Sequence, residues 1–337
     1  MTRTAPRAMR LRSRGAEAPW LEASAESLPA LAPNEVLLEV SACGVCRTDL
    51  QIVQGDLPAH APQVVPGHQA VGRVASIGSE VTSWQVGDRG ATTWLAWADG
   101  TCPYCRSGRE NLCPQARFTG WDVDGGFATH VRVHQDFLIR LPDAISDVEA
   151  APLMCAGVIG YRALRLAGVA PGMRLGLYGF GASAHLAIQA ARVAGAVVHV
   201  ASRSAGDLAL ARQLGATSTG AYDEPPPEPL DAAITFAPVG SVVIDALRAL
   251  APGGRVVINA IHLDGIPAFD YDLLWGERAI GSVANVTRQD AREFLELAAQ
   301  HGIRATARHY PLADANAALQ DLAAGTIGAP SAVLVPD

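Results

Sequence analysis

The second half of the chain alternates strand, glycine turn and helix, and this alternation constrains the fold more than any other feature. It begins near residue 157. Its elements, in order, are a strand at 174–178, a helix ending at Gly195, a strand at 196–202, a helix at 206–215, a strand at 230–238, a helix at 241–254 and a strand at 255–263. Strands and helices that alternate at this spacing predict an α/β fold with a doubly wound parallel sheet of the Rossmann type.

Residues 1–155 have a different pattern, which indicates a β-rich domain. Short stretches of alternating hydrophobicity, such as "EVLLEV" at 35–40 and "FATHVRVH" at 127–134, are separated by many glycines and prolines. This is typical of short strands joined by turns. The first 15 residues are basic but lead into no hydrophobic stretch, so we expect a solvated arm and no secretory signal.

The composition excludes several classes of function. A chain of 337 residues exceeds one ordinary core, so two domains are expected. All 26 basic residues are arginine, which excludes a lysine Schiff base and a P-loop lysine. The net charge is −7, so nucleic acid is not an expected partner. No apolar run reaches the roughly 18 residues that cross a bilayer, so we expect a cytoplasmic protein without a membrane partner.

The segment "GFGASA" at 179–184 has the pattern G-x-G-x-x-A. Alone it is also compatible with an ordinary strand-to-helix turn, but here it follows a predicted strand and opens a helix. In a dinucleotide-binding turn, Gly179 permits the tight turn and Gly181 lets the backbone approach a pyrophosphate. Ala184 lets the helix pack closely on the sheet. The pattern therefore predicts a dinucleotide cofactor whose phosphates lie at the helix N-terminus.

The end of the next strand indicates which cofactor is preferred. Proteins that bind NAD(H) place an acidic residue there, on the ribose hydroxyls. This chain has Ser202 and Arg203 at that point, and the next acidic residue is Asp207. A hydroxyl and a guanidinium suit a 2′-phosphate. We therefore expect NADP(H) to be preferred, with NAD(H) as the alternative.

The loop "DGTCPYCRSGRENLC" at 99–113 holds three of the six cysteines. Cys102, Cys105 and Cys113 are close in sequence, and Asp99 precedes Cys102 at the interval that separates Cys102 from Cys105. Three thiolates and one carboxylate can form a tetrahedral zinc site, although a fourth cysteine would be the more usual ligand than Asp99. A site closed by four protein ligands leaves no position for substrate, so its role would be structural.

The stretch "SACGVCRTDLQ" at 41–51 contains a second pair of cysteines, Cys43 and Cys46. A Cys-x-x-Cys pair can hold one metal, act as a redox dithiol, or contain only one functional sulfur. The local sequence leaves all three interpretations open. The remaining cysteine, Cys155, lies far along the chain.

Several motifs together resemble the zinc-dependent alcohol dehydrogenases of the medium-chain dehydrogenase/reductase superfamily. They occur in that family's order and spacing over essentially the whole chain: "GVCRTD" at 44–49, "PGHQAVGRVASIG" at 66–78, "VGDR" at 86–89, the cysteine loop at 99–113, "CAG" at 155–157, the turn at 179–184 and "YPL" at 310–312. The resemblance implies a GroES-like catalytic domain at 1–156 and 287–337 and a Rossmann domain at 157–286.

The resemblance also implies a catalytic zinc held by Cys46, His68 and Cys155, with a fourth position open. Two residues would then have roles beside the metal: Asp49 would orient the His68 ring, and Thr48 would pass on the alcohol proton. By the same resemblance, Arg47 would reach the cofactor pyrophosphate, and Trp94 and Trp121 lie in segments that line the substrate pocket.

Two positions depart from the family pattern. Gln51 stands where a histidine usually ends the proton relay, and it cannot take a proton near neutral pH. Gln69 replaces the usual glutamate after the zinc-ligating histidine, which removes a negative charge near the metal.

The resemblance implies an enzyme that interconverts a primary or secondary alcohol and its aldehyde or ketone by hydride transfer, as a homodimer or homotetramer acting on a small molecule. A zinc-free quinone reductase on the same fold is disfavoured, because such proteins lack the three ligands. A catalytically weak or non-catalytic cofactor-binding protein, with a regulatory or structural role, is the alternative.

Overall fold

The computed structural model of the chain describes residues 7–28, 30–58, 60–260 and 262–336. These residues form two compact units. The first contains residues 1–155, 285–299 and 304–337, and the second contains residues 156–284 and 300–303. Among the described residues, no helix is long and apolar enough to span a membrane.

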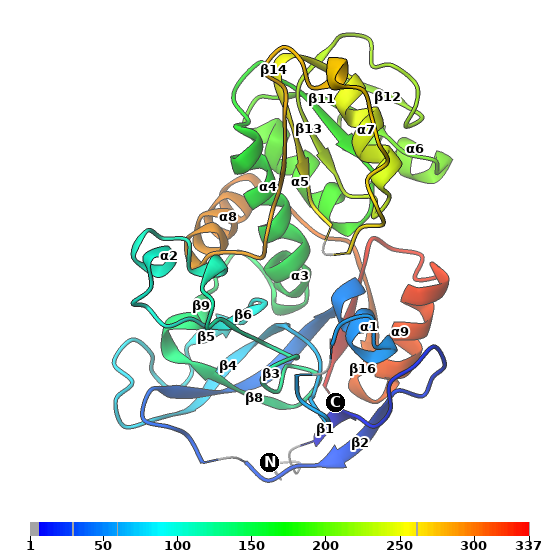
Figure 1. Cartoon of the computed structure of the whole chain (residues 1–337). Coiled ribbons are helices and arrows are strands. Elements are labelled where there is room, and N and C mark those ends of the chain that lie inside the picture. Colours follow the sequence, from blue (N-terminus) through cyan, green and yellow to red (C-terminus); the bar gives the residue numbers. More distant parts are fainter. Residues whose placement is uncertain (1–6, 29, 59, 261, 337) are drawn as a thin grey trace. The chain divides into compact units, whose positions relative to one another are not determined.

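The second unit contains a parallel sheet, drawn in green to orange in Figure 1. In the part of the chain that the structure describes, six strands lie in the order β12-β11-β10-β13-β14-β15, and every neighbouring pair is parallel. This is the doubly wound strand order of dinucleotide-binding folds, so the expected α/β fold class is confirmed. The elements are α4 (Val158–Ala167), β10 (Arg174–Tyr178), α5 (Ala182–Val193), β11 (Val197–Ala201), α6 (Ala205–Gln213), β12 (Ser218–Gly220), β13 (Leu230–Thr235), α7 (Gly240–Arg248), β14 (Leu250–Ile258) and β15 (Ala279–Ser282).

The central strands of this sheet are almost continuously apolar because helices cover them. Every residue of β10 after Arg174 is buried, as are four of the five residues of β11. The helices α4 and α5 contact each other, and α7 packs against β13 and β14. Strands buried on both faces need apolar side chains at successive positions, which explains why these segments show no alternation.

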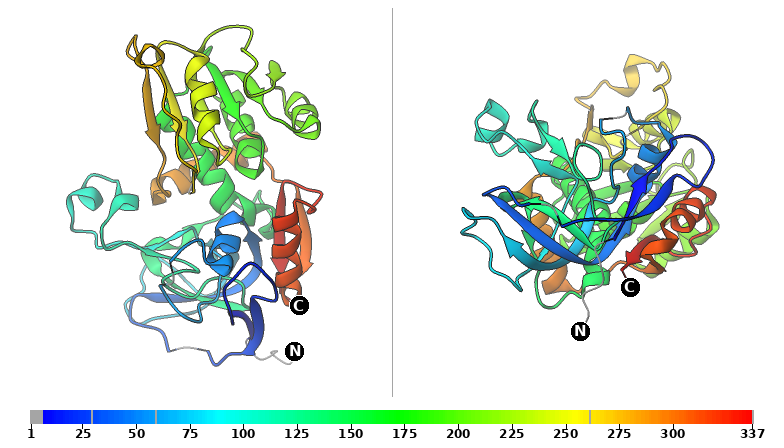
Figure 2. Two further views of the ribbon diagram at one scale, coloured as in Figure 1. Left: turned by 45° about the vertical axis from the view of Figure 1, so that its right-hand side comes forward. Right: turned by 90° about the horizontal axis from the view of Figure 1, so that it is seen from below.

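The first unit is built on a mixed, largely antiparallel sheet. Its main path is β16-β17-β3-β4-β5-β9, with β8 paired to β3. The elements are β1 (Arg7–Leu11), β2 (Leu21–Ala25), β3 (Glu35–Val45), α1 (Arg47–Gln54), β4 (Gln69–Ile77), β5 (Arg89–Ala91), β6 (Leu95–Trp97), α2 (Pro103–Arg106), β7 (Arg117–Phe118), β8 (His130–His134), β9 (Ile139–Arg140), α3 (Asp147–Pro152), α8 (Arg288–His301), β16 (Ala307–Pro311), α9 (Ala315–Ala324) and β17 (Ser331–Val335). Figures 1 and 2 show α9 against β16 and β17.

Two expectations for this unit need correction. The basic first segment is not a solvated arm throughout, because Arg7–Leu11 forms β1 and pairs with β2, and Ala8, Met9 and Leu11 are buried. Residues 1–6 of that segment lie outside the described residues. The strand expected at 35–40 continues to Val45, which brings the chain directly to Cys46 at the start of α1.

Candidate metal centres and cofactor-binding turn

Cys46, His68 and Cys155 lie together within the first unit, although they are far apart in sequence. Their ligand atoms all lie within 4.8 Å of one another. The Sγ atom of Cys46 is 3.4 Å from the Nε2 atom of His68. His68 is buried, and the two cysteines are partly exposed. Two sulfurs and one imidazole nitrogen at these separations make a donor set for one tetrahedral zinc ion with a fourth position left over.

Cys46 is fixed by its position as the N-cap of α1. Its backbone N–H donates to the Oδ2 atom of Asp49 at 2.9 Å, and its Sγ atom accepts from the N–H of Thr48 at 3.4 Å. This reciprocal arrangement is a capping box, with sulfur in place of the usual hydroxyl. The helix start therefore sets the direction of the thiol.

His68 follows a glycine that no other residue could replace without strain. Gly67 has φ +97°, and a Cβ atom there would lie 2.4 Å from the Phe127 ring. The N–H of Gly67 donates to Asp49 Oδ1 at 3.1 Å, and the same oxygen lies 3.3 Å from His68 Nδ1. The carboxylate of Asp49 thus contacts both the backbone before His68 and the ring itself.

Cys155 lies in Leu153–Gly157, one turn of π-helix that follows α3. π-Helical turns are uncommon and occur frequently at functional sites. The preceding helix is tied to the sheet at Asp147, which accepts from Arg89 Nε of β5 at 3.1 Å and also from the Ser41 hydroxyl of β3. The sheet therefore anchors the segment that carries the third ligand.

The electrostatics of this group fit a bound cation. The hydrogen bond with Cys155 and burial both raise the pKa of the Cys46 thiol well above its usual value. Burial lowers the pKa of His68, but the neighbouring Cys46 and Asp49 outweigh burial and raise it to about 10. Without a cation these groups therefore favour binding protons. A zinc ion displaces the thiol protons and offsets the negative charge, so the residues present fit the metal.

Cys43 is not part of this group. It lies on β3 with 1% of its surface exposed, paired with Ala70 of β4. Burial raises the pKa of its thiol well above the usual value. A thiol of this kind behaves as a small apolar core residue.

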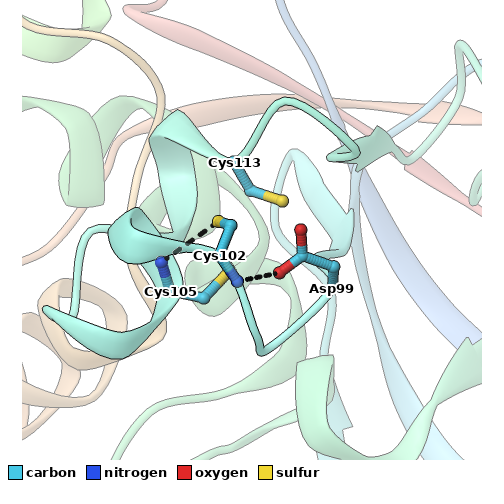
Figure 3. A group of neighbouring side chains, drawn as sticks. All are labelled: Asp99, Cys102, Cys105 and Cys113. Atoms are coloured by element: carbon cyan, nitrogen blue, oxygen red, sulfur yellow. Dashed lines mark hydrogen bonds between the residues drawn. The ribbon is translucent and has the colours of Figure 1, made fainter.

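The second candidate centre is the loop that holds Asp99, Cys102, Cys105 and Cys113, and Figure 3 shows these four side chains close together. Their ligand atoms lie within 4.8 Å of one another. The Oδ1 atom of Asp99 accepts from the N–H groups of Thr101 and Cys102, at 2.7 and 2.8 Å. These bonds hold the pKa of Asp99 well below its usual value. The carboxylate is therefore ionised and keeps one oxygen for a metal, so this group also fits zinc.

The glycine turn of the second unit has the geometry that its sequence predicts. Gly179 has φ +91°, and a Cβ atom there would lie 2.9 Å from the backbone nitrogen of Ala237. Gly181 is the N-cap of α5, and a Cβ atom there would meet nothing within 4 Å. Ala184 is fully buried in the first turn of that helix. The turn therefore leaves open space beside the N-terminus of α5, where a phosphate is stabilised.

The end of β11 contains an interaction that the sequence did not reveal. Ser202 is buried, and its hydroxyl donates to the Oδ2 atom of Asp207 at 2.8 Å. Arg203 is exposed. The phenol of Tyr222 lies beside both Ser202 and Arg203. The serine hydroxyl is thus already used by a carboxylate, and the exposed guanidinium of Arg203, with Tyr222 beside it, is the group at this point that can face a phosphate.

Three further predicted site residues lie on α1. Arg47 is exposed, and Thr48 is buried with 3% of its surface exposed. Gln51 is buried, and its Oε1 atom has no hydrogen-bond partner among the described residues. A buried acceptor without a hydrogen-bond partner lowers folding stability unless another group reaches it.

Comparisons with known proteins agree with this geometry. Residues 32–143 match the alcohol dehydrogenase GroES-like domain, and residues 184–300 match the zinc-binding dehydrogenase family. AdhA of Mycobacterium tuberculosis, named as a probable alcohol dehydrogenase, is 50% identical over 94% of this chain and 93% of its own length. An alcohol dehydrogenase of Geobacillus stearothermophilus is 34% identical over 89% of this chain and 91% of its own length.

A solved structure is also similar. A protein from Sinorhizobium meliloti 1021, described as a zinc-binding dehydrogenase and crystallised with NADP, is 28% identical with a TM-score of 0.86, covering 99% of this chain and 100% of the other. Sequence and fold agree over nearly the whole length. The chain therefore belongs to the zinc-binding alcohol dehydrogenase family.

Proposed function

We propose that this member of the alcohol dehydrogenase family interconverts a primary or secondary alcohol and its aldehyde or ketone at the Cys46, His68 and Cys155 centre. The observation that carries the proposal is the convergence of these three side chains within 4.8 Å, with Asp49 against the imidazole. When bound, zinc supplies Lewis-acid chemistry and a nicotinamide cofactor accepts or donates hydride.

In this proposal each residue of the chain has a defined task. Cys46 and Cys155 would hold the metal as thiolates and His68 would hold it through Nε2, with Asp49 Oδ1 beside its Nδ1 at 3.3 Å. Thr48, buried two residues after Cys46, accepts the alcohol proton at its hydroxyl oxygen and passes its own proton onward. Gln51 can hydrogen-bond along that route but cannot hold the proton, because an amide does not titrate near neutral pH.

We propose NADP(H) as the preferred cofactor. The support is the exposed Arg203 with Tyr222 beside it, together with the NADP bound to the similar Sinorhizobium protein. Asp207 opposes this preference, because its carboxylate lies on Ser202 and repels a 2′-phosphate. Replacing Asp207 by asparagine should therefore raise the ratio of kcat/KM for NADPH to that for NADH, and Arg203→Ala should lower it.

The proposal is tested by a panel of alcohols and aldehydes, run with NADPH and NADH on protein of measured zinc content. NADPH-dependent reduction of aldehydes is expected. A protein that binds cofactor but turns over no member of the panel would instead be a non-catalytic relative. A preference for NADH would show that Asp207, not Arg203, decides the cofactor.

The substrate of this family is a small molecule. We further propose a homodimer or homotetramer located in the cytoplasm. Sedimentation velocity tests the oligomeric state, and a monomer would contradict it.

A further inference from the structure

The segment 64–67 leads directly to the proposed ligand His68 and is paired with the segment 125–127. Three backbone N–H groups of 125–127 donate to carbonyls of 64–67, at distances of 2.6 to 2.9 Å. The pairing is close, because a Cβ atom at Gly125 would lie 2.1 Å from the Gly67 carbonyl oxygen. A displacement of either segment therefore moves the residue directly before His68.

The strand β1 joins these two segments through its backbone. The Leu11 N–H donates to the Val64 carbonyl at 3.0 Å, and the Met9 N–H donates to the Phe127 carbonyl at 2.8 Å. Arg10 lies between these two donors in the sequence. This position brings its side chain to both segments.

The guanidinium of Arg10 bonds to both segments at the residue just before each one. Its Nη1 atom donates to the Gln63 carbonyl at 2.7 Å and to Asp124 Oδ1 at 3.2 Å, and its Nη2 atom donates to Asp124 Oδ2 at 3.1 Å. The Oδ1 atom of Asp124 also accepts from the Val65 N–H at 2.9 Å. Hydrogen bonds between ionised groups are the stronger kind, and a paired guanidinium and carboxylate fix each other's orientation. Arg10 and Asp124 therefore fasten the two segments to each other.

The fastened segment is bonded on to the proposed zinc ligand. The N–H of Gly67 donates to Asp49 Oδ1 at 3.1 Å, and the same oxygen lies 3.3 Å from His68 Nδ1. The His68 carbonyl accepts from the Thr92 hydroxyl at 2.9 Å. The backbone on both sides of the imidazole is thus held by hydrogen bonds, so the position of the segment 64–67 affects where the ring lies.

The geometry points to Arg10 and Asp124 as positioning residues for the metal centre, which hold the segment 64–67 so that His68 meets the metal in the right place. This inference rests on the proposed function, since the centre is part of it. The pair acts through Val65 and the backbone that follows, and it makes no bond to the metal or to the reacting atoms.

The effect of this pair on the metal centre can be separated from an effect on the fold. The side chain of Arg10 is 27% exposed and that of Asp124 is 53% exposed, and ion pairs this exposed contribute little to folding stability. Glu26 supplies the matched control. Its carboxylate accepts from the same guanidinium, at 3.0 and 3.1 Å, and from the Ser24 hydroxyl, and it follows β2 and belongs to neither fastened segment.

The test measures the zinc affinity of both metal centres by competition with a chromogenic chelator, in the whole chain. Arg10→Ala and Asp124→Ala should each lower the affinity of the catalytic centre about 3- to 10-fold, less than the 10- to 100-fold usual for a group bonded directly to a ligand. Asp124→Asn keeps an oxygen for the Val65 N–H and should recover part of the loss. Because the two residues act together, the double variant should lose little more than either single one.

Two controls show whether the effect is specific. Glu26→Ala should keep the wild-type affinity, and the zinc site of the loop at 99–113 should be unchanged in every variant. If both metal centres weaken equally, or if Glu26→Ala weakens the catalytic centre as much as Asp124→Ala does, the pair is only structural and the inference is wrong.

A second measurement reports the ligand geometry and does not depend on turnover. With cobalt in the catalytic centre and zinc left in the loop at 99–113, the visible absorption bands of the cobalt ion depend on where the imidazole lies. These bands should shift in Arg10→Ala and Asp124→Ala and remain in place in Glu26→Ala. Bands identical to those of the wild type in both variants would overturn the positioning role.

The failure of this inference can be told apart from the failure of the proposed function. If the wild type oxidises alcohols and the Arg10 and Asp124 variants keep its zinc affinity and cobalt spectrum, the proposed function stands and the inference fails. If the wild type binds metal at the centre but turns over no alcohol or aldehyde, the proposed function fails, and the affinities and spectra still decide the positioning role. If the wild type binds no metal there, both fail.

Discussion

The Oδ1 atom of Asp49 lies 3.3 Å from the Nδ1 atom of His68, and neither side chain is more than 1% exposed. The same carboxylate accepts from the N–H groups of Cys46 and Gly67. Asp49 therefore contacts the ring of His68 and the backbone N–H of Cys46, two of the three proposed zinc ligands.

Asp49→Asn should lower the zinc affinity of the catalytic centre about 10- to 100-fold, the usual cost of losing a group that orients a ligand. The neutral amide keeps only one accepting oxygen in place of the two charged oxygens that face Cys46 N–H, Gly67 N–H and the imidazole, so the ring is held less firmly. Competition with a chromogenic chelator measures this affinity. Asp56→Asn is the matched control, because Asp56 is an exposed carboxylate just beyond the same helix, and it should release zinc like the wild type.

The loop at 99–113 makes a separate prediction. Asp99→Asn keeps an oxygen for the N–H groups of Thr101 and Cys102 but supplies a poor metal ligand. Asp99→Asn should lower the zinc affinity of this site at least about tenfold, since losing a ligand lowers the affinity no less than losing a group that orients a ligand. Asp99→Cys should bind zinc at least as tightly as the wild type. Zinc retention in Asp99→Asn equal to the wild type would exclude the carboxylate as the fourth ligand.

The contact between Arg89 and Asp147 predicts a pH dependence of stability. Burial raises the pKa of Asp147, but bonds from Ser41 and Arg89 outweigh burial and lower it overall. The folded-state pKa of Asp147 lies below its unfolded value of about 3.9. The stabilisation from the ionised carboxylate is therefore fully present at pH values above about 3.9. It is lost as pH falls through the folded-state pKa.

Asp147→Asn should therefore lower the free energy of unfolding at pH 7 by about 1–3 kcal/mol, with the difference from the wild type shrinking as the pH falls below about 4. Denaturant titration at several pH values measures it. Asp143→Asn is the matched control, because Asp143 is fully exposed at 3.8 Å from the same Arg89. If the loss of stability in Asp147→Asn persists unchanged at low pH, the stabilisation by Asp147 is not ionic.

Gln51 predicts a missing inflection in the pH profile. With an amide at this position, the rate of alcohol oxidation should not inflect near pH 6.5, the usual histidine pKa. Gln51→His should create such an inflection. A profile that is unchanged by this substitution would mean that the proton leaves Thr48 by another route.

The sequence predicted some parts of the molecule for physical reasons and missed others. The parallel sheet was predictable because strands buried by helices on both sides require apolar runs such as 174–178. The turn after this run was predictable because its backbone conformation at position 179 favours glycine. The gathering of Cys46, His68 and Cys155 came from resemblance, since no local pattern connects ligands so far apart.

Contacts that depend on the conformation of the loops could not be predicted from the sequence. Asp207 reaches back to Ser202 because the first turn of α6 directs it there, and His60 meets Asp122 across 62 positions of sequence. The first strand was missed because basic residues alternate only partly with apolar ones, while Ala8, Met9 and Leu11 are buried.

The most direct test of the central claim is the zinc content per chain of the wild type, Cys43→Ser and Cys46→Ser, measured together with NADPH-dependent aldehyde reduction. The described residues contain one group of four candidate ligands and one group of three. The wild type should therefore hold two zinc ions. Cys43→Ser should also hold two and keep its activity. Cys46→Ser should hold one and lose its activity. A Cys46→Ser protein that retains both ions and turns over aldehyde, or a Cys43→Ser protein that loses one, would contradict the assignment of Cys46, His68 and Cys155 as the catalytic zinc site.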